Sequence, residues 1–131
     1  MTIALLLADD EPGVRSLLAA RARHALADVT VLEAEDGAHA LEIGLRERPH
    51  IALLDVQMPR LDGIAAAITL RELQPQMRLA LYTADPNAHR DTARELRLPL
   101  FDKLDIGGTI RWLELQARAP AAPPPWLRRS A

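Results

Sequence analysis

The 131-residue chain has no cysteine and only one lysine, Lys103, against fifteen arginines. The absence of cysteine excludes disulfides, thiolate nucleophiles and thiolate metal sites. The net charge of −2 gives no general attraction to nucleic acid or to an anionic membrane, so we expect neither as a partner. The longest apolar runs, such as Ile3–Ala8 and Ile64–Ile68, fall far short of a membrane span, and Asp9-Asp10 interrupts any signal-peptide core. We therefore expect a cytoplasmic protein.

The composition is that of one globular domain. Hydrophobic residues make up 49% of the chain and charged residues 26%, and the length suits one domain rather than two. Short β-like runs alternate with helical patterns, which is typical of a parallel sheet covered by helices. Ile51–Leu54 is apolar at successive positions, as expected for a strand buried on both faces. The sequence thus predicts an α/β doubly wound fold with five strands: Ile3–Ala8, Val29–Ala34, Ile51–Leu54, Arg78–Thr83 and Leu98–Phe101.

Proline and aspartate mark the helix boundaries. Pro12 and Pro86 suit the first turns of helices, where a missing N–H costs nothing. Aspartates precede four helical patterns and can each accept a hydrogen bond from an unpaired first-turn N–H; these are Asp36, Asp62, Asp85 and Asp105. We expect caps rather than catalytic groups at these four positions.

Polar side chains collect where the expected strands end. Asp9 and Asp10 follow the first strand, Asp55 the third, Thr83 closes the fourth and Lys103 follows the fifth. In an open sheet of this kind, ligands bind outside the carboxyl ends of the strands. Five suitable groups on one edge predict a pocket for a divalent metal and a phosphoryl group.

Electrostatics explains why these groups belong together. Like charges about 4 Å apart repel by roughly 4 kcal/mol at an effective dielectric near 20, so three clustered carboxylates need a cation among them. Oxygen-only ligands favour a hard ion, and Mg²⁺ is the natural choice. Asp55 could then attack phosphorus, with Lys103 neutralising charge on the phosphoryl oxygens and the Thr83 hydroxyl bonding a third oxygen.

These residues resemble the receiver domain of two-component response regulators. The match comprises Asp9-Asp10, the segment Asp55-Val56-Gln57-Met58-Pro59, the Asp62-Gly63 turn, Thr83-Ala84 and Lys103, in family order and at family-like separations. The resemblance implies a flavodoxin-like sheet in the order 2-1-3-4-5. It also implies that a histidine kinase or phosphotransfer protein phosphorylates Asp55. Asp9 or Asp10, Asp55 and the backbone carbonyl of Gln57 would then hold Mg²⁺, and small Ala84 would leave room for the phosphoryl group.

The resemblance covers about residues 1–118 and leaves a Pro-rich tail, 119–131, which we expect to be extended. We expect a stand-alone receiver, which would act by binding an unknown downstream protein, by passing the phosphoryl group onward or by competing for a kinase. Phosphorylation would alter the surface formed by the fourth helix, the fifth strand and the fifth helix, which is also a possible homodimer face.

Two departures from the family pattern keep other functions open. Leu100 stands where receivers commonly have the aromatic residue that follows the switch threonine, with Phe101 one place later, and Leu104 replaces a common proline. They motivate an alternative, a phosphorylation-independent receiver that binds its partner constitutively. A phosphohydrolase that recycles Asp55 is less favoured, because the haloacid-dehalogenase-like version has a second aspartate where this chain has Gln57.

The last helix, taken as about 105–118, carries an apolar stripe at helical spacing that we expect in the core: Ile106, Ile110, Leu113 and Ala117. Trp112 and Leu115 fall away from that stripe. They either pack under the tail or form part of a partner surface. The four histidines show no repeated ligand spacing, so we expect surface or helix-flank residues rather than a metal site.

Overall fold

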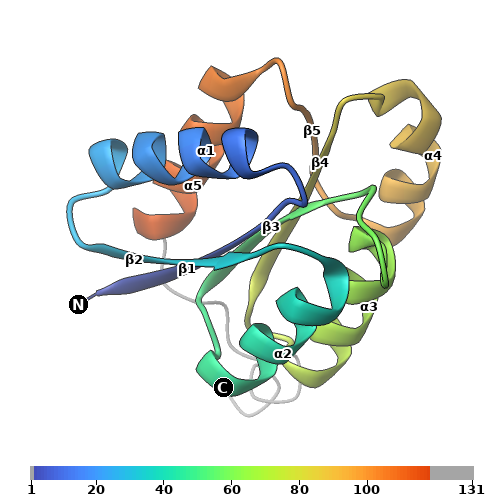
Figure 1. The fold of residues 1–131 in the computed structure, drawn as a ribbon, viewed down its shortest axis with the longest axis horizontal. Coiled ribbons are helices and arrows are strands. Elements are labelled where there is room, and N and C mark those ends of the chain that lie inside the picture. Colours follow the sequence, from blue (N-terminus) through green and yellow to red (C-terminus); the bar gives the residue numbers. More distant parts are fainter. Residues whose placement is uncertain (1, 119–131) are drawn as a thin grey trace, which may run out of the picture.

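The computed structural model describes residues 2–118 of the chain, and the anticipated Pro-rich tail, 119–131, lies outside the described residues. Figure 1 shows a twisted sheet with helices on both faces. The strands are β1 (Ile3–Ala8), β2 (Val29–Ala34), β3 (Ile51–Asp55), β4 (Arg78–Thr83) and β5 (Leu100–Asp102). The helices are α1 (Pro12–Ala25), α2 (Gly37–Glu47), α3 (Gly63–Leu73), α4 (Pro86–Leu96) and α5 (Ile106–Arg118).

The sheet has the predicted topology. All neighbouring strands pair in parallel, in the order β2-β1-β3-β4-β5. The chain therefore starts in the middle of the sheet, winds outward to β2, and then crosses back to β3, β4 and β5. This reversal between β1 and β3 is where a doubly wound sheet leaves room for a ligand at the strand ends. None of the helices in the described part is long and apolar enough to cross a membrane.

Strand alternation divides the core into two layers. Leu6, Leu54 and Leu81 face the layer that includes residues of α2, α3 and α4. Leu5 and Leu53 face the opposite layer, which is closed by α1 and α5. Figure 1 shows α1 and α5 on one side of the sheet and α2 and α3 on the other. Both faces of β3 are buried, which explains its uninterrupted apolar sequence.

Three of the four predicted aspartate caps form. Asp36 accepts from the N–H of His39, Asp62 from that of Ala65 and Asp105 from that of Gly108, at 2.8, 2.8 and 2.9 Å respectively. The prediction for Asp85 was wrong, because Asp85 precedes α4 but makes no side-chain cap bond. Its own N–H instead donates to Oγ1 of Thr83, at 3.1 Å. The Asp85 backbone is thus bonded to the last residue of β4, and the Asp85 side chain does not cap α4.

The fifth strand was predicted two residues too early. Leu98 is buried beneath the end of α4 and its N–H donates to the carbonyl of Ala93, so it closes the helix instead of joining the sheet. Pro99 has no N–H to donate. Regular pairing therefore begins at Leu100, opposite Leu81.

The last helix packs as the apolar stripe indicates, with one difference. Ile110 and Leu113 are buried, and Ile106 and Ala117 pack against the same core layer. Trp112 was expected away from this stripe, but it also packs against the layer, and its ring lies 5.9 Å from that of Phe101. A large ring spans more of the helix circumference than helical spacing alone allows for. Leu115 is half exposed.

Gly63 is required for the close approach of α3 to the end of β3. A Cβ atom on Gly63 would lie 2.0 Å from the carbonyl oxygen of Asp55. The N–H of Gly63 donates to the carbonyl of Val56 at 3.0 Å, which ties the helix to the residue after Asp55. This glycine thus fixes the chain that leaves Asp55.

We predict that Gly63→Ala lowers the free energy of unfolding by about 1–3 kcal/mol, because α3 must move away from a backbone carbonyl. Gly107→Ala is the matched control, since a Cβ there meets no atom within 4 Å. In the helix α5, that change should be neutral or stabilising by up to about 1 kcal/mol. Urea denaturation of both variants measures the difference, and equal effects would contradict the close-packing account.

Candidate functional site

The strand register places three site residues in one row. Ala8 pairs with Leu54, so Asp9 and Asp55 follow at the same level, and Asp55 pairs with Tyr82 on β4. Alternation along the strands turns side chains at this level toward the layer of α1 and α5. Three neighbouring strands thus contribute two carboxylates and a phenol to one spot.

Lys103 lies between the two buried carboxylates. Its Nζ is 2.9 Å from Oδ2 of Asp55 and 3.1 Å from Oδ2 of Asp9. The N–H of Lys103 donates to the carbonyl of Thr83 at 2.9 Å, which holds the residue at the end of β4. The side chain is 18% exposed, so the ammonium is bound in the site rather than solvated at the surface. The predicted convergence of Asp9, Asp55 and Lys103 is present in the structure.

Asp9 is fully buried and well supplied with donors. Oδ1 accepts from the N–H of Glu11 at 2.8 Å, and Oδ2 accepts from the hydroxyl of Tyr82 at 2.6 Å in addition to Lys103. The guanidinium of Arg15 donates to the Asp9 carbonyl at 2.6 Å. Both the side chain and the backbone of Asp9 are therefore fixed before any ligand arrives.

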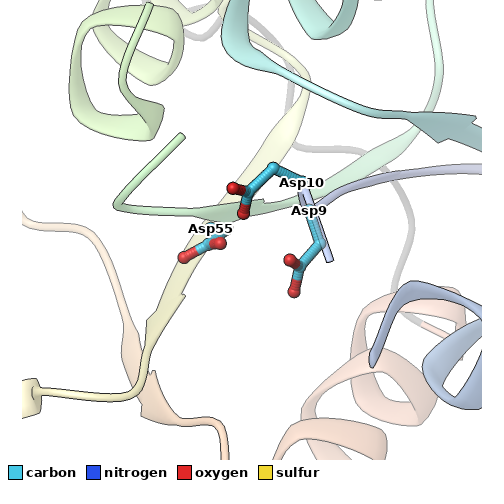
Figure 2. Close-up of side chains that lie close together, drawn as sticks. All are labelled: Asp9, Asp10 and Asp55. Carbon is cyan, nitrogen blue, oxygen red and sulfur yellow. The ribbon is translucent and has the colours of Figure 1, made fainter. Parts of the chain in front are cut away.

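Asp10 differs from Asp9 in being exposed. Within residues 2–118, no protein donor contacts its carboxylate, yet it can bring an oxygen within 4.8 Å of oxygens of Asp9 and Asp55. Figure 2 shows the carboxyl groups of Asp9 and Asp10 leaving the chain in different directions, with that of Asp55 nearby. Three carboxylates and one ammonium leave excess negative charge. This oxygen-only donor set suits a hard divalent cation such as Mg²⁺.

Burial and nearby charges set the protonation states of Asp55 and Lys103. Desolvation raises the pKa of Asp55 to about 6, and the hydrogen bond from Lys103 offsets this only in part. Burial alone would lower the pKa of Lys103, but its bonds to Asp55 and Asp9 outweigh that effect and raise the pKa above the ordinary value. Lys103 is therefore a permanent cation, while ionised Asp55 lacks sufficient compensating charge.

An open hollow of about 540 Å³ lies over Asp10 and Asp55, and its lining residues are Asp10, Glu11, Pro12, Asp55, Gln57, Ala84 and Lys103. Thr83 does not line it. This side chain is fully buried, and its oxygen accepts from the N–H of Asp85. To bond a group on Asp55, the Thr83 hydroxyl would have to turn toward the hollow.

Leu100 and Phe101 face opposite sides of the sheet. Leu100 packs against the layer of α2, α3 and α4, whereas Phe101 packs against the layer of α1 and α5 and beside Trp112. The aromatic ring is therefore not at the place that Leu100 occupies. Leu104 is 90% exposed next to Lys103.

The histidines have individual roles that spacing does not reveal. Nδ1 of His50 accepts from the N–H of Ala4 at 3.0 Å, and Nδ1 of His39 accepts from that of Glu35 at 3.3 Å. His89 is half-buried on α4, and its Nε2 has no partner among the described residues. Among the described residues, no histidine belongs to a group of three potential metal ligands.

Tyr82 and Arg15 were missed by the sequence reasoning. Tyr82 reads as an ordinary residue of a buried strand, and Arg15 as an ordinary residue of a helix. A signal was available for Tyr82: aligning the ends of β3 and β4 places it beside Asp55 on the same face. Arg15 follows Asp9 by six positions across a turn, and no pattern in the sequence specifies that contact.

This fold and site define a class of proteins in which a buried carboxylate, an acidic pair and a lysine converge at the carboxyl edge of a doubly wound sheet. The profile of the response regulator receiver domain matches residues 5–104. The chain belongs to this family, whose members are the receiver domains of two-component systems.

Curated relatives and solved structures agree. The response regulator MprA of Mycobacterium ulcerans (strain Agy99) is 37% identical over 84 residues, which cover 64% of this chain and 35% of that protein. The transcriptional regulatory protein GlrR of Escherichia coli (strain K12) is 29% identical over 127 residues, covering 93% of this chain and 28% of GlrR. The chain thus spans about a third of the length of these relatives.

Among solved structures, the REC domain of AraT, a response regulator from Geobacillus stearothermophilus, is similar with a TM-score of 0.71 and 26% identity, covering 89% of this chain and 96% of that one. The response regulator domain of Thermotoga maritima CheB shares the fold with a TM-score of 0.72, covering 95% of this chain and all of that one, at 24% identity. The predicted flavodoxin-like receiver fold is confirmed.

We predict that Asp55→Asn stabilises the metal-free protein at pH 7.5 by about 1–3 kcal/mol. The folded state holds the Asp55 proton more tightly than the unfolded state, so the free energy of unfolding falls as pH rises from about 4 to about 6. Asparagine does not ionise, and the advantage of the variant should therefore be absent near pH 4 and complete above pH 6.

Urea denaturation at the two pH values, with chelator present, measures this effect. Asp91→Asn is the control, because that carboxylate is 94% exposed and its loss removes no buried charge. An Asp55→Asn advantage of the same size at pH 4 and pH 7.5 would show that ionisation of Asp55 is not its cause.

Proposed function

We propose that this receiver accepts a phosphoryl group on Asp55 from a histidine kinase or phosphotransfer protein and thereby changes its affinity for a downstream partner. The observation that carries the proposal is the placement of Lys103 on Oδ2 of both Asp55 and Asp9, at the floor of an open acidic hollow. A buried carboxylate with an excess of negative neighbours is a poor structural element and a good nucleophile once a cation is supplied.

Mg²⁺ fits this donor set, and the residues that would hold it are Asp10, Asp55 and the backbone carbonyl of Gln57, with Asp9 beside them. When bound, the metal supplies charge neutralisation for the incoming phosphoryl oxygens. Asp10 presents a carboxylate with no competing protein donor among the described residues, whereas both oxygens of Asp9 already accept hydrogen bonds. Asp10 is therefore the more available ligand of the acidic pair.

Four residues of the chain would take part in the transfer of the phosphoryl group. A carboxylate oxygen of Asp55 forms the new bond to phosphorus, and the bond between phosphorus and the donor's leaving group breaks. Lys103 keeps a positive charge next to the oxygen that it already contacts. Ala84 lines the hollow without filling it, and Thr83 can contribute its hydroxyl after turning away from Asp85.

Phosphorylation of Asp55 would act by altering the affinity for a partner rather than by catalytic turnover. A phosphoryl group draws Lys103 and Thr83 toward the hollow, which bears on β4, β5 and the adjoining helices. We propose that the α4-β5-α5 face meets the downstream protein, or a second copy of the chain, with half-exposed Leu115 and the ring of Trp112 on α5 as contacts. Such a receiver would act in the cytoplasm as a conditional binding module, not as a multiple-turnover enzyme.

Incubation with acetyl phosphate and Mg²⁺ should add the mass of one phosphoryl group to the intact protein, with acetate as the leaving group. The adduct should be absent from Asp55→Asn and present in Asp91→Asn, whose changed carboxylate lies on the solvent side of α4. Intact-mass spectrometry measures the adduct. A wild-type protein left unmodified by acetyl phosphate and by histidine kinases alike would contradict the proposal.

Mg²⁺ should also raise the melting temperature of the unphosphorylated protein. A ligand that binds only the folded state contributes about 1.4 kcal/mol at ten times its dissociation constant. Asp10→Asn should remove most of the shift, while Asp91→Asn should keep it. An unchanged response in Asp10→Asn would exclude Asp10 as a ligand.

A further inference from the structure

The Tyr82 hydroxyl is a buried polar group on a ring that packs among apolar side chains. The side chain is 1% exposed and packs with Leu5, Leu7 and Leu53 between the sheet and the helices α1 and α5. Its hydroxyl lies 2.6 Å from Oδ2 of Asp9, a short bond between a phenol and a carboxylate. Burial and the nearby Asp9 charge raise the pKa of Tyr82 far above the ordinary value, so the hydroxyl keeps its proton and donates.

The same oxygen of Asp9 also accepts from Lys103. Oδ2 is thus shared by a neutral donor at 2.6 Å and a cationic donor at 3.1 Å, while Lys103 reaches Asp55 at the shorter distance of 2.9 Å. In addition, the ammonium lies 5.2 Å from the centre of the Tyr82 ring, within range of a cation–π contact. Tyr82 therefore touches both the acid that competes for Lys103 and Lys103 itself.

We propose that Tyr82 is a positioning residue that satisfies Asp9 with its hydroxyl and so keeps the Lys103 ammonium on Asp55. Asp9 and Asp55 compete for one ammonium, because Lys103 is the only lysine in the chain. A hydrogen-bond donor to the Asp9 carboxylate weakens the attraction of that carboxylate for the Lys103 ammonium. This inference rests on the proposed function, since it concerns how the lysine is kept available for a phosphoryl group on Asp55.

Without the hydroxyl, Oδ2 of Asp9 would be a buried anion with Lys103 as its main partner on that side. The ammonium would then shift toward Asp9. It would become less available to phosphoryl oxygens at Asp55, and phosphorylation would slow. A tyrosine that merely fills the core would show neither effect when its hydroxyl alone is removed.

Tyr82→Phe tests the ammonium position directly, in the absence of metal and phosphodonor. Because the chain has a single lysine, protein labelled with ¹³C-lysine gives one Cε signal. Asp9→Asn and Asp55→Asn provide reference positions for an ammonium held by Asp55 alone and by Asp9 alone. We expect the Tyr82→Phe signal to move from the wild-type position toward that of Asp55→Asn. A signal that stays at the wild-type position overturns the proposal.

The kinetic arm is a double-mutant cycle with acetyl phosphate at saturating Mg²⁺. We expect Tyr82→Phe to slow phosphorylation by about tenfold, the rate equivalent of one charge-assisted hydrogen bond. In an Asp9→Asn background the same change should cost less than about twofold, because the competing anion is gone. Equal slowing in both backgrounds overturns the proposal, since the hydroxyl would then act independently of Asp9.

Leu53→Val is the matched structural control. Leu53 is fully buried in the same layer and has no polar side-chain atom, so this variant loses core packing while every polar group of the site is kept. Its phosphorylation rate and lysine signal should match those of the wild type at a temperature where all variants are folded. Slowing of Leu53→Val equal to that of Tyr82→Phe would assign the effect to core packing and overturn the proposal.

A further measurement leaves Tyr82 in place and observes its own NMR signal. Tyr82 is the only tyrosine, so ¹³Cζ-tyrosine labelling gives one signal, which should shift between the wild type and Asp9→Asn if the hydroxyl donates to an anion there. An unshifted signal overturns the proposal. If the wild type is not phosphorylated at all, the proposed function fails, while the lysine and tyrosine spectra still decide the role of Tyr82.

Discussion

The site depends on the sharing of one ammonium between two buried carboxylates. Asp9 and Asp55 sit at the ends of adjacent strands, and Lys103 bridges their Oδ2 atoms. Without that cation, two like charges at this separation would repel by several kcal/mol in a protein interior. With it, the pair is tolerated, but the nearby Asp10 keeps the balance negative. The site thus carries two more negative than positive charges when its three carboxylates are ionised, and under the proposed function a divalent ion would balance them.

The backbone enforces this arrangement through strand register and close packing. Pairing of β1, β3 and β4 brings Asp9, Asp55 and Tyr82 to one level, and the absence of a side chain at Gly63 lets α3 begin against the carbonyl of Asp55. Arg15 reaches from α1 to the carbonyl of Asp9. The acids are therefore placed by the sheet and held by its neighbours. Their positions do not depend on attraction to a ligand.

Much of the fold could be predicted from the sequence, because its signals are local. Alternating strand and helix patterns predicted every strand, the apolar run of β3 predicted its central place, and Pro12 and Pro86 begin α1 and α4. Strand boundaries set by a neighbouring helix were less accessible. The start of β5 depends on how Leu98 closes α4, which is a tertiary contact.

In the site, too, the features with local sequence signals could be predicted and those set by tertiary packing could not. Each acid and Lys103 could be assigned to the carboxyl edge because strand ends are visible in the sequence, and their convergence follows from parallel pairing. The orientation of Thr83, the tilted ring contact of Trp112 with Phe101 and the bond from Tyr82 to Asp9 depend on side-chain directions that only packing determines. Asp85 is an example: it occupies the N-cap position of α4, as the sequence predicts, but its side chain makes no capping hydrogen bond.

The most direct test of the account is the location of the modification after treatment with acetyl phosphate and Mg²⁺. Reduction with borohydride converts an acyl phosphate into a stable homoserine, which peptide mass spectrometry can place in the sequence. The account predicts that the label falls on Asp55, the carboxylate that Lys103 contacts most closely. A label on Asp9, on Asp10 or on a histidine, with Asp55 unmodified, would contradict it.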